Sequence, residues 1–319
     1  MIRNLRTKLT FIFLVIGLLP AIVLNLAFYF RIDNREREII YRDSISLLES
    51  ISNNLDSFFQ LHSAELETLA NDQSISLPVS LMANLEPNSS VWRTTLTTVL
   101  NSINRVAREY ESLYHDIFVT SNDYILYNPE GTLLVDGVSL DFINTTLSTG
   151  SAAWSPLIWS EKLQANLLFV AAPVVNIDGK VVGTVGAAIS HAQVEELVQK
   201  FASPSDLTYD AYLVKHDGLL LSSVPYEGYA TFANKVDTDI ITSATQIVTA
   251  VSENPFIDLE YRSFEDQVVL GYAKRVQLGD EPAILIVEAN KDAALAGVYA
   301  TQLLFATIMV SALVLILLI

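Results

Sequence analysis

The stretch FVAAPVVNIDGKVVGTVGAAISHAQVEELV, residues 169–198, decides the fold. Two valine-rich runs flank the turn Ile177-Asp178-Gly179, where glycine supplies the positive φ that a tight turn needs. This pattern predicts a β-hairpin. Two other runs break at turns of the same kind, YILYNPEGTLLVD at 124–136 and AYLVKHDGLLLSS at 211–223. The centre of the chain is therefore predicted to consist of hairpins.

The outer two runs are alike, which indicates an internal repeat. Gly131-Thr-Leu-Leu in one matches Gly218-Leu-Leu-Leu in the other, 87 residues later. Because a chain of this length is near the upper limit for a single hydrophobic core, we expect two similar α/β modules. The stretch FASPSDLTYD at 201–210, with its Pro and Ser, is the predicted junction. The modules are predicted at 74–203 and 204–292.

Residues 31–73 contain neither Pro nor Gly and are predicted to form one long stalk helix. One stripe along it repeats every three or four residues: Ile45, Leu48, Ser52, Leu55, Phe59, His62, Leu66 and Leu69. A second stripe lies beside it: Leu47, Ile51, Phe58 and Leu61. Either one stripe covers a module while the other pairs with a second protomer in a homodimer, or both stripes pack on the same module.

Two uncharged segments predict attachment to a lipid bilayer. Residues 9–30 number 22, and at about 1.5 Å per residue they span roughly 33 Å, enough for a bilayer core of about 30 Å. Residues 293–319 number 27 and form the second predicted span. The Lys and Arg count on the two sides of the first span does not decide its orientation. Because long loops translocate largely regardless of charge, residues 31–292 are expected outside the cytoplasm and residues 1–8 within it. The second span reaches no Lys or Arg, so we expect the natural protein to continue into a further domain.

Composition and motifs narrow the function classes. The chain has 36 acidic and 19 basic residues, which makes nucleic acid an unexpected partner. It has no cysteine, so its stability must come from a packed core. Its four histidines are scattered, and the sequence contains no HExxH, GxSxG, glycine-rich phosphate loop or paired-cysteine motif. We therefore expect no catalytic residue, metal site or cofactor within residues 1–319.

The order of these parts resembles the extracytoplasmic double Cache sensor domains of bacterial transmembrane receptors. Residues 169–198 are similar to the closing strands and exit helix of the membrane-distal module. AYLVKHDGLLLSS is similar to the opening of the membrane-proximal module, and VVLGYAKRVQLGDEPAILIVEANKDAAL at 268–295 is similar to its closing strands. The resemblance covers nearly the whole chain.

The resemblance implies an α+β fold with two tandem PAS-like modules on a long N-terminal helix, flanked by two transmembrane helices. It also implies a ligand pocket mainly in the distal module. The location implied is the bacterial inner membrane, with residues 31–292 periplasmic or extracellular. The output domain implied is cytoplasmic: a histidine kinase of a two-component system, a chemotaxis signalling domain or a nucleotide cyclase.

Ligand identity is where the sequence departs from amino-acid-sensing relatives. Those relatives carry an Arg-x-Trp-Tyr step that holds a carboxylate and a later Asp that holds an ammonium group. Residues 134–154 contain no arginine, and Ala188 stands where that Asp would be. The sequence therefore predicts a small-molecule ligand other than a free α-amino acid bound in the usual mode.

Aromatic residues dominate what remains of the predicted pocket. WSPLIWSEKL at 154–163 contributes Trp154, Trp159 and Glu161, and Trp159-Ser-Glu161 resembles the aromatic-x-acid step of the family. Tyr127 and Phe118 are expected to line the same cavity. Aromatic walls with one carboxylate suit an amine, another cation or a flat, weakly polar molecule. The other interpretation is that both tryptophans serve as core or lid packing.

These observations predict a membrane-anchored sensor with no catalytic site of its own. Ligand binding would be transmitted through the last strand, AILIVEAN at 283–290, into the helix that begins near Lys291. The alternative is a membrane-anchored interaction module that binds a protein or polymer through its acidic surface without a small-molecule pocket.

Overall fold

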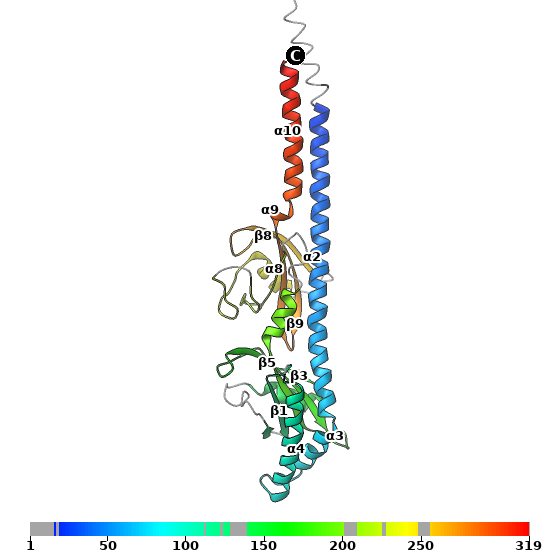
Figure 1. The fold of residues 1–319 in the computed structure, drawn as a ribbon, viewed down its shortest axis with the longest axis vertical. Helices are drawn as coiled ribbons and strands as arrows, with labels where there is room; N and C mark the ends of the chain where they lie inside the picture. Colours follow the sequence, from blue (N-terminus) through cyan, green and yellow to red (C-terminus); the bar gives the residue numbers. More distant parts are fainter. Residues whose placement is uncertain are drawn as a thin grey trace, which may run out of the picture.

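The computed structural model shows an elongated molecule in which two β-sheets are stacked along one long helix (Figure 1). The long helix is α2 (Leu19–Ala70), and α10 (Ala296–Leu318) lies beside its N-terminal part. Asn25 contacts Met309 and Phe28 packs on Phe305 where these two helices meet. The structure describes residues 16, 19–111, 113–121, 124–127, 139–200, 209–224, 228–247 and 256–318.

Helix α2 is the common back wall of both modules. The positions of the first predicted stripe face the sheets, and Leu48, Leu55 and Leu66 are among its buried members. From the second stripe, Ile51 is also buried, whereas Leu61 is 57% exposed. The helix therefore uses the first stripe and part of the second within one chain, and it leaves the side around Leu61 exposed.

The distal module contains a six-stranded antiparallel sheet in the order β2-β1-β6-β5-β3, with β4 paired to β5. Helices α3 and α4 cover its tip together with the end of α2. The elements in chain order are α3 (Gln73–Met82), α4 (Ser90–Glu109), β1 (Asp116–Ser121), β2 (Tyr124–Tyr127), α6 (Asp141–Thr149), β3 (Ala153–Trp154), β4 (Ile158–Ser160), β5 (Ala165–Val175), β6 (Val181–Ser190) and α7 (His191–Gln199).

The proximal module contains a four-stranded antiparallel sheet in the order β7-β10-β9-β8. Its elements are β7 (Tyr209–Val214), α8 (Asp239–Ile247), β8 (Phe256–Arg262), β9 (Val268–Leu278), β10 (Glu281–Asn290) and α9 (Lys291–Ala294). The order β7-β10-β9-β8 matches β1-β6-β5-β3 of the distal sheet, and in each module a helix follows the strand that closes the hairpin. The two modules are therefore structural repeats.

Each sheet buries both of its faces. Side chains alternate along a strand, so one set points at α2 and the other points away from it. In the distal sheet Ile117 and Val170 belong to the core on α2, whereas Phe118 and Phe169 belong to a second core under α6. In the proximal sheet Leu285 faces α2. The opposite face packs under α8.

The sequence predicted the main features of this architecture. The turn at Gly179, with a φ of 76°, joins β5 and β6 as an antiparallel hairpin. Residues 128–136 of the hairpin predicted at 124–136 and residues 201–208 of the predicted junction lie outside the described residues. Within the part of the chain that the structure describes, no helix combines the length and apolarity needed to cross a bilayer. Most of the first half of the predicted span 9–30 lies outside that part.

Candidate functional site

The face of the distal sheet that points away from α2 is the candidate ligand site. Phe118 of β1 and Phe169 of β5 form its apolar floor and pack against Phe142 of α6, with ring centroids 6.1 Å apart for Phe118 and Phe142 and 6.2 Å apart for Phe142 and Phe169. Small residues on β5 and β6 leave room for these rings. A Cβ on Gly186 would lie 2.1 Å from Cζ of Phe118, so glycine is required there. We call this buried face of the sheet the distal face.

Asp116 brings a carboxylate to the distal face. It is 3% exposed and pairs directly with Ala188 across the β1–β6 ladder. Alternation along β1 puts Asp116 on the same side as Phe118, two residues later. Asp116 and Glu288 are the two acidic side chains that are fully buried among the described residues. A buried carboxylate on an aromatic face is a suitable partner for a cationic group.

The structure separates the residues predicted to line the pocket. Phe118 is completely buried on the distal face. Trp154 pairs with Val170 on the opposite face, where its ring packs on Phe59 at 4.7 Å and its Nε1 donates to Ser63. Its backbone N–H donates to Asp280 of the proximal module, so Trp154 joins the two modules to α2.

The remaining predicted pocket residues lie at or beyond the edge of the described site. Trp159 is 49% exposed on β4, and Glu161 is exposed in the turn that follows. The backbone of Tyr127 belongs to β2, but its side chain lies outside the described residues, as do residues 128–138. Sequence reasoning missed Asp116, because its position beside Ala188 depends on pairing between strands that are far apart in the chain.

The corresponding face of the proximal sheet also holds a buried acid. Glu288 of β10 is 1% exposed and accepts hydrogen bonds at Oε1 from the hydroxyl groups of Tyr212 and Tyr261. Its Oε2 is buried and has no hydrogen-bond partner among the described residues. Burial raises the pKa of Glu288 above its usual value, despite the two tyrosine donors.

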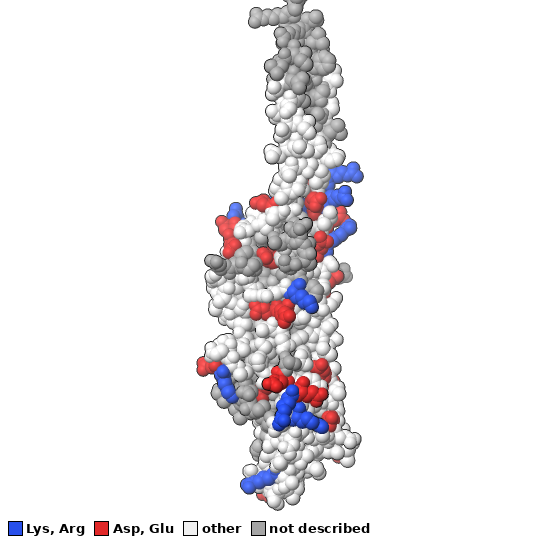
Figure 2. Space-filling view, in the orientation of Figure 1, with Lys and Arg blue, Asp and Glu red and all other residues white. Residues whose placement is uncertain are grey.

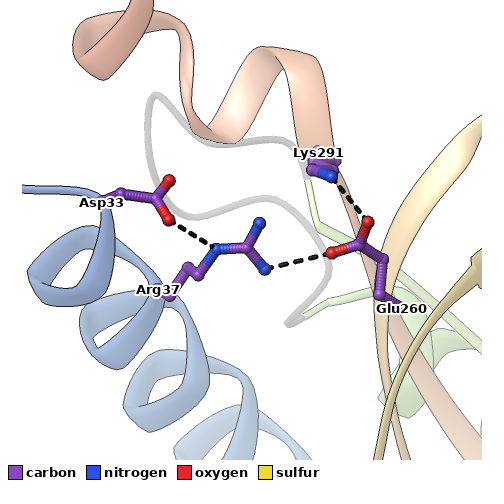
Figure 3. Close-up of polar contacts among 4 residues, drawn as sticks. All are labelled: Asp33, Arg37, Glu260 and Lys291. Carbon is purple, nitrogen blue, oxygen red and sulfur yellow. Dashed lines mark hydrogen bonds and ion pairs between the residues drawn. The ribbon is translucent and has the colours of Figure 1, made fainter. Parts of the chain in front are cut away.

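A charged cluster joins the proximal module to the helices that leave it (Figure 3). Arg37 of α2 donates to Asp33 on its own helix at 3.1 Å and to Glu260 of β8 at 3.1 Å. Lys291, the first residue of α9, donates to the other oxygen of Glu260. The Lys291 hydrogen bond is the main reason that the pKa of Glu260 is lowered. The cluster thus connects α2, the proximal sheet and the start of the exit helix.

Charged side chains are distributed unevenly along the molecule. Figure 2 shows them over the two modules and just above the proximal module. The face of α10 and α2 that it displays carries no coloured side chain further toward the top of the view.

Comparisons with known proteins identify the fold. No family model matches the sequence, and no curated protein matches it. The sensory domain of the Campylobacter jejuni chemoreceptor Tlp3 is similar in structure, with a TM-score of 0.56 at 13% identity over 82% of this chain and 97% of that one. The extracellular domain of mmHK1S-Z2, described as a histidine kinase, has a TM-score of 0.52 at 16% identity over 78% and 97%.

The same comparisons correct the prediction about the ligand. The Tlp3 domain is also similar in its complex with L-valine, with a TM-score of 0.54 at 13% identity over 82% of this chain and 96% of that one. Other Tlp3 structures contain isoleucine and L-norvaline. The exclusion of free α-amino acids is therefore contradicted. It rested on the lack of arginine in residues 134–154 and on Ala188, and Asp116 supplies a carboxylate directly opposite Ala188. The chain has the double Cache fold of extracellular sensor domains from histidine kinases and chemoreceptors.

Proposed function

We propose that this chain is the sensing part of a transmembrane receptor whose distal module binds a small ligand with a protonated amine, free α-amino acids included. The observation that carries the proposal is Asp116, a buried carboxylate at the edge of the Phe118 and Phe169 floor. The ligand's ammonium group would pair with Asp116 while its apolar part packs on the rings. The amino acids bound by Tlp3 domains of the same fold support this class of ligand.

We further propose that residues 9–30 and 293–319 anchor the chain in the bacterial inner membrane and that residues 31–292 are extracytoplasmic. Their uncharged sequences support this arrangement, as does the lack of charge on the displayed face of α10. The receptor would act as a homodimer, with the exposed side of α2 around Leu61 as the contact surface. Its output domain would be cytoplasmic, a histidine kinase in the first instance and otherwise a chemotaxis or cyclase domain.

Binding by the purified full chain tests the ligand proposal. In detergent micelles, thermal melting with each of the common amino acids should identify at least one that raises the Tm with increasing concentration, because a ligand stabilises the folded state by mass action. Titration calorimetry would then measure its Kd.

Two variants give this test its specificity. Asp116→Asn should raise the Kd of the identified ligand at least tenfold, because a charge-assisted hydrogen bond contributes about 1.5–3 kcal/mol. Asp178→Asn, in the exposed turn between β5 and β6, removes the same charge away from the distal face and should leave the Kd unchanged. Equal affinity for wild type and Asp116→Asn would contradict the assigned role of Asp116.

A further inference from the structure

The two fully buried acids among the described residues, Asp116 and Glu288, occupy related places in the two modules. Asp116 of β1 pairs with Ala188 of β6, and Asp210 of β7 pairs with Glu288 of β10. Because β1 and β6 correspond to β7 and β10, the proximal module has an acid at both positions where the distal module has one.

Aromatic residues repeat in the same way. Phe118 stands two residues after Asp116, and Tyr212 stands two residues after Asp210. Directly opposed residues and alternate residues of a strand share one face, so Asp210, Tyr212 and Glu288 all point away from α2. The face of the proximal sheet that points away from α2 therefore combines acidic and aromatic side chains as the distal face does, and it has one more carboxylate.

The contacts of Glu288 leave one oxygen available. Tyr212 and Tyr261 both donate to Oε1, and Oε2 is buried without a hydrogen-bond partner among the described residues. A buried acceptor without a donor costs about 1–3 kcal/mol. The two tyrosine hydroxyl groups need the acceptor that Oε1 supplies, whereas no described residue offers a donor to Oε2.

Tyr261 holds the position of its hydroxyl group by packing on Gly271. A Cβ at residue 271 would lie 2.3 Å from Cε1 of Tyr261, so the ring needs glycine at this point. Gly271 is the register partner of Glu288 on β9. The sheet itself thus directs a tyrosine hydroxyl at the buried carboxylate.

The geometry points to a second binding site in the proximal module, at which Glu288 and Asp210 hold the protonated primary amine of a small molecule. An ammonium group has three N–H donors, enough for Oε2 of Glu288, for Asp210 and for a tyrosine oxygen. Two carboxylates on one face favour a cation over a neutral ligand, because each stabilises the positive charge. This site is separate from the distal face and does not depend on the function proposed for it.

The location of Glu288 gives such a site a direct connection to the exit helix. Asn290, two residues further along β10, caps α9 by accepting from the backbone N–H of Ala293, and it donates to Gln267. Any shift of β10 on ligand binding acts on this cap without passing through the distal module. The proximal site would therefore act on the same strand that the distal signal has to use.

Small amines test the inference on the full chain in detergent micelles. The probes are methylammonium, ethanolammonium and 1,4-diammoniobutane chlorides, each up to 50 mM, followed by Tm and by titration calorimetry. Tetramethylammonium chloride and sodium chloride at the same ionic strength are the controls, because each supplies a cation that has no N–H donor. We expect at least one primary amine to raise the Tm and the two controls to leave it unchanged.

Variants then locate the site. Glu288→Gln keeps the shape of the side chain and should raise the Kd of the amine at least tenfold. Asp210→Asn is a second variant on the half-buried neighbour and should weaken it severalfold. Asp116→Asn should leave this binding event unchanged, which separates it from the distal site.

The inference would be overturned by the absence of stabilisation by every amine, by equal stabilisation by tetramethylammonium, or by unchanged amine affinity in both Glu288→Gln and Asp210→Asn. Amine binding that is lost only in Asp116→Asn would assign the binding to the distal face and would also refute a proximal site.

Discussion

Protonation of His191 should destabilise the junction between the two modules. His191 is the first residue of α7, is 2% exposed and packs its ring on Phe232 with centroids 4.9 Å apart. It borders a small cavity together with Lys215 and Glu281 of the proximal module. Its Nε2 is buried with no hydrogen-bond partner among the described residues. Burial lowers the pKa of His191 to about 4, and Glu195 offsets only part of this shift.

The pKa shift sets the size of the effect. A histidine with a pKa of about 6.5 in the unfolded chain and about 4 in the folded chain binds its proton more readily when unfolded. Stability from this group is therefore fully present above pH 6.5 and is lost as the pH falls toward 4. Between pH 7 and pH 4.5 the loss amounts to about 2 kcal/mol, since each pKa unit corresponds to about 1.4 kcal/mol.

Urea unfolding of three proteins at pH 7.0 and pH 4.5 measures this loss. His191→Phe keeps an aromatic ring beside Phe232 and removes the titrating group, so its free energy of unfolding should fall by about 2 kcal/mol less than that of wild type. His216→Phe, at an exposed position in the β7 hairpin, should behave like wild type. Acidic residues titrate in all three proteins and cancel in the comparison.

If the free energy of unfolding falls equally for His191→Phe and wild type between the two pH values, protonation of His191 does not destabilise the folded protein. Strong destabilisation of His191→Phe at pH 7 would also contradict the prediction, because that result would mean that the imidazole makes an essential hydrogen bond in its neutral form.

Three further predictions concern the distal face and the route to the exit helix. Gly186→Ala should lower stability by about 2 kcal/mol or more, because its Cβ would lie 2.1 Å from Phe118, and a fall in Tm would show it. Arg37→Met should speed hydrogen exchange of α9 severalfold, since the ion pair is partly exposed and contributes about 0.5–1 kcal/mol; Arg42→Met, which breaks an exposed pair on α2, should not. Two glycines inserted after Asn290 should abolish ligand-dependent output in the full receptor while leaving ligand affinity intact; unchanged output would exclude transmission through β10 and α9.

The fold could be predicted from the sequence wherever a short pattern has a local cause. The sequence pattern predicted a tight turn with positive φ at Gly179, and Gly179 has a positive φ in the structure. The long helix followed from a run without Pro or Gly, and α2 extends further toward the N-terminus than the predicted stalk, starting at Leu19. Each of these signals lies within a few neighbouring residues.

The candidate sites could not be predicted in the same way, because they depend on strand register. Trp154 and Ala153 are neighbours in the chain but lie on opposite faces of the sheet, so a shift of one residue decides whether the indole meets α2 or the distal face. Asp116 became a candidate ligand-binding residue only because the structure pairs it with Ala188. Glu288 was part of an apolar strand in the sequence, and its tyrosine partners come from β7 and β8.

The shared helix also dictates when different parts of the protein can fold during synthesis. The distal half of α2 meets α3, which follows it directly, and β5 and β6 of the distal sheet, which precede the proximal module in the chain. The N-terminal half meets partners near the end of the chain: Tyr41 packs on Tyr272, and Ile40 and Leu48 belong to the core that includes Tyr272 and Leu285. On the ribosome this half of the helix keeps an apolar stripe uncovered until almost the last strand has emerged, and a chaperone would find its natural target there.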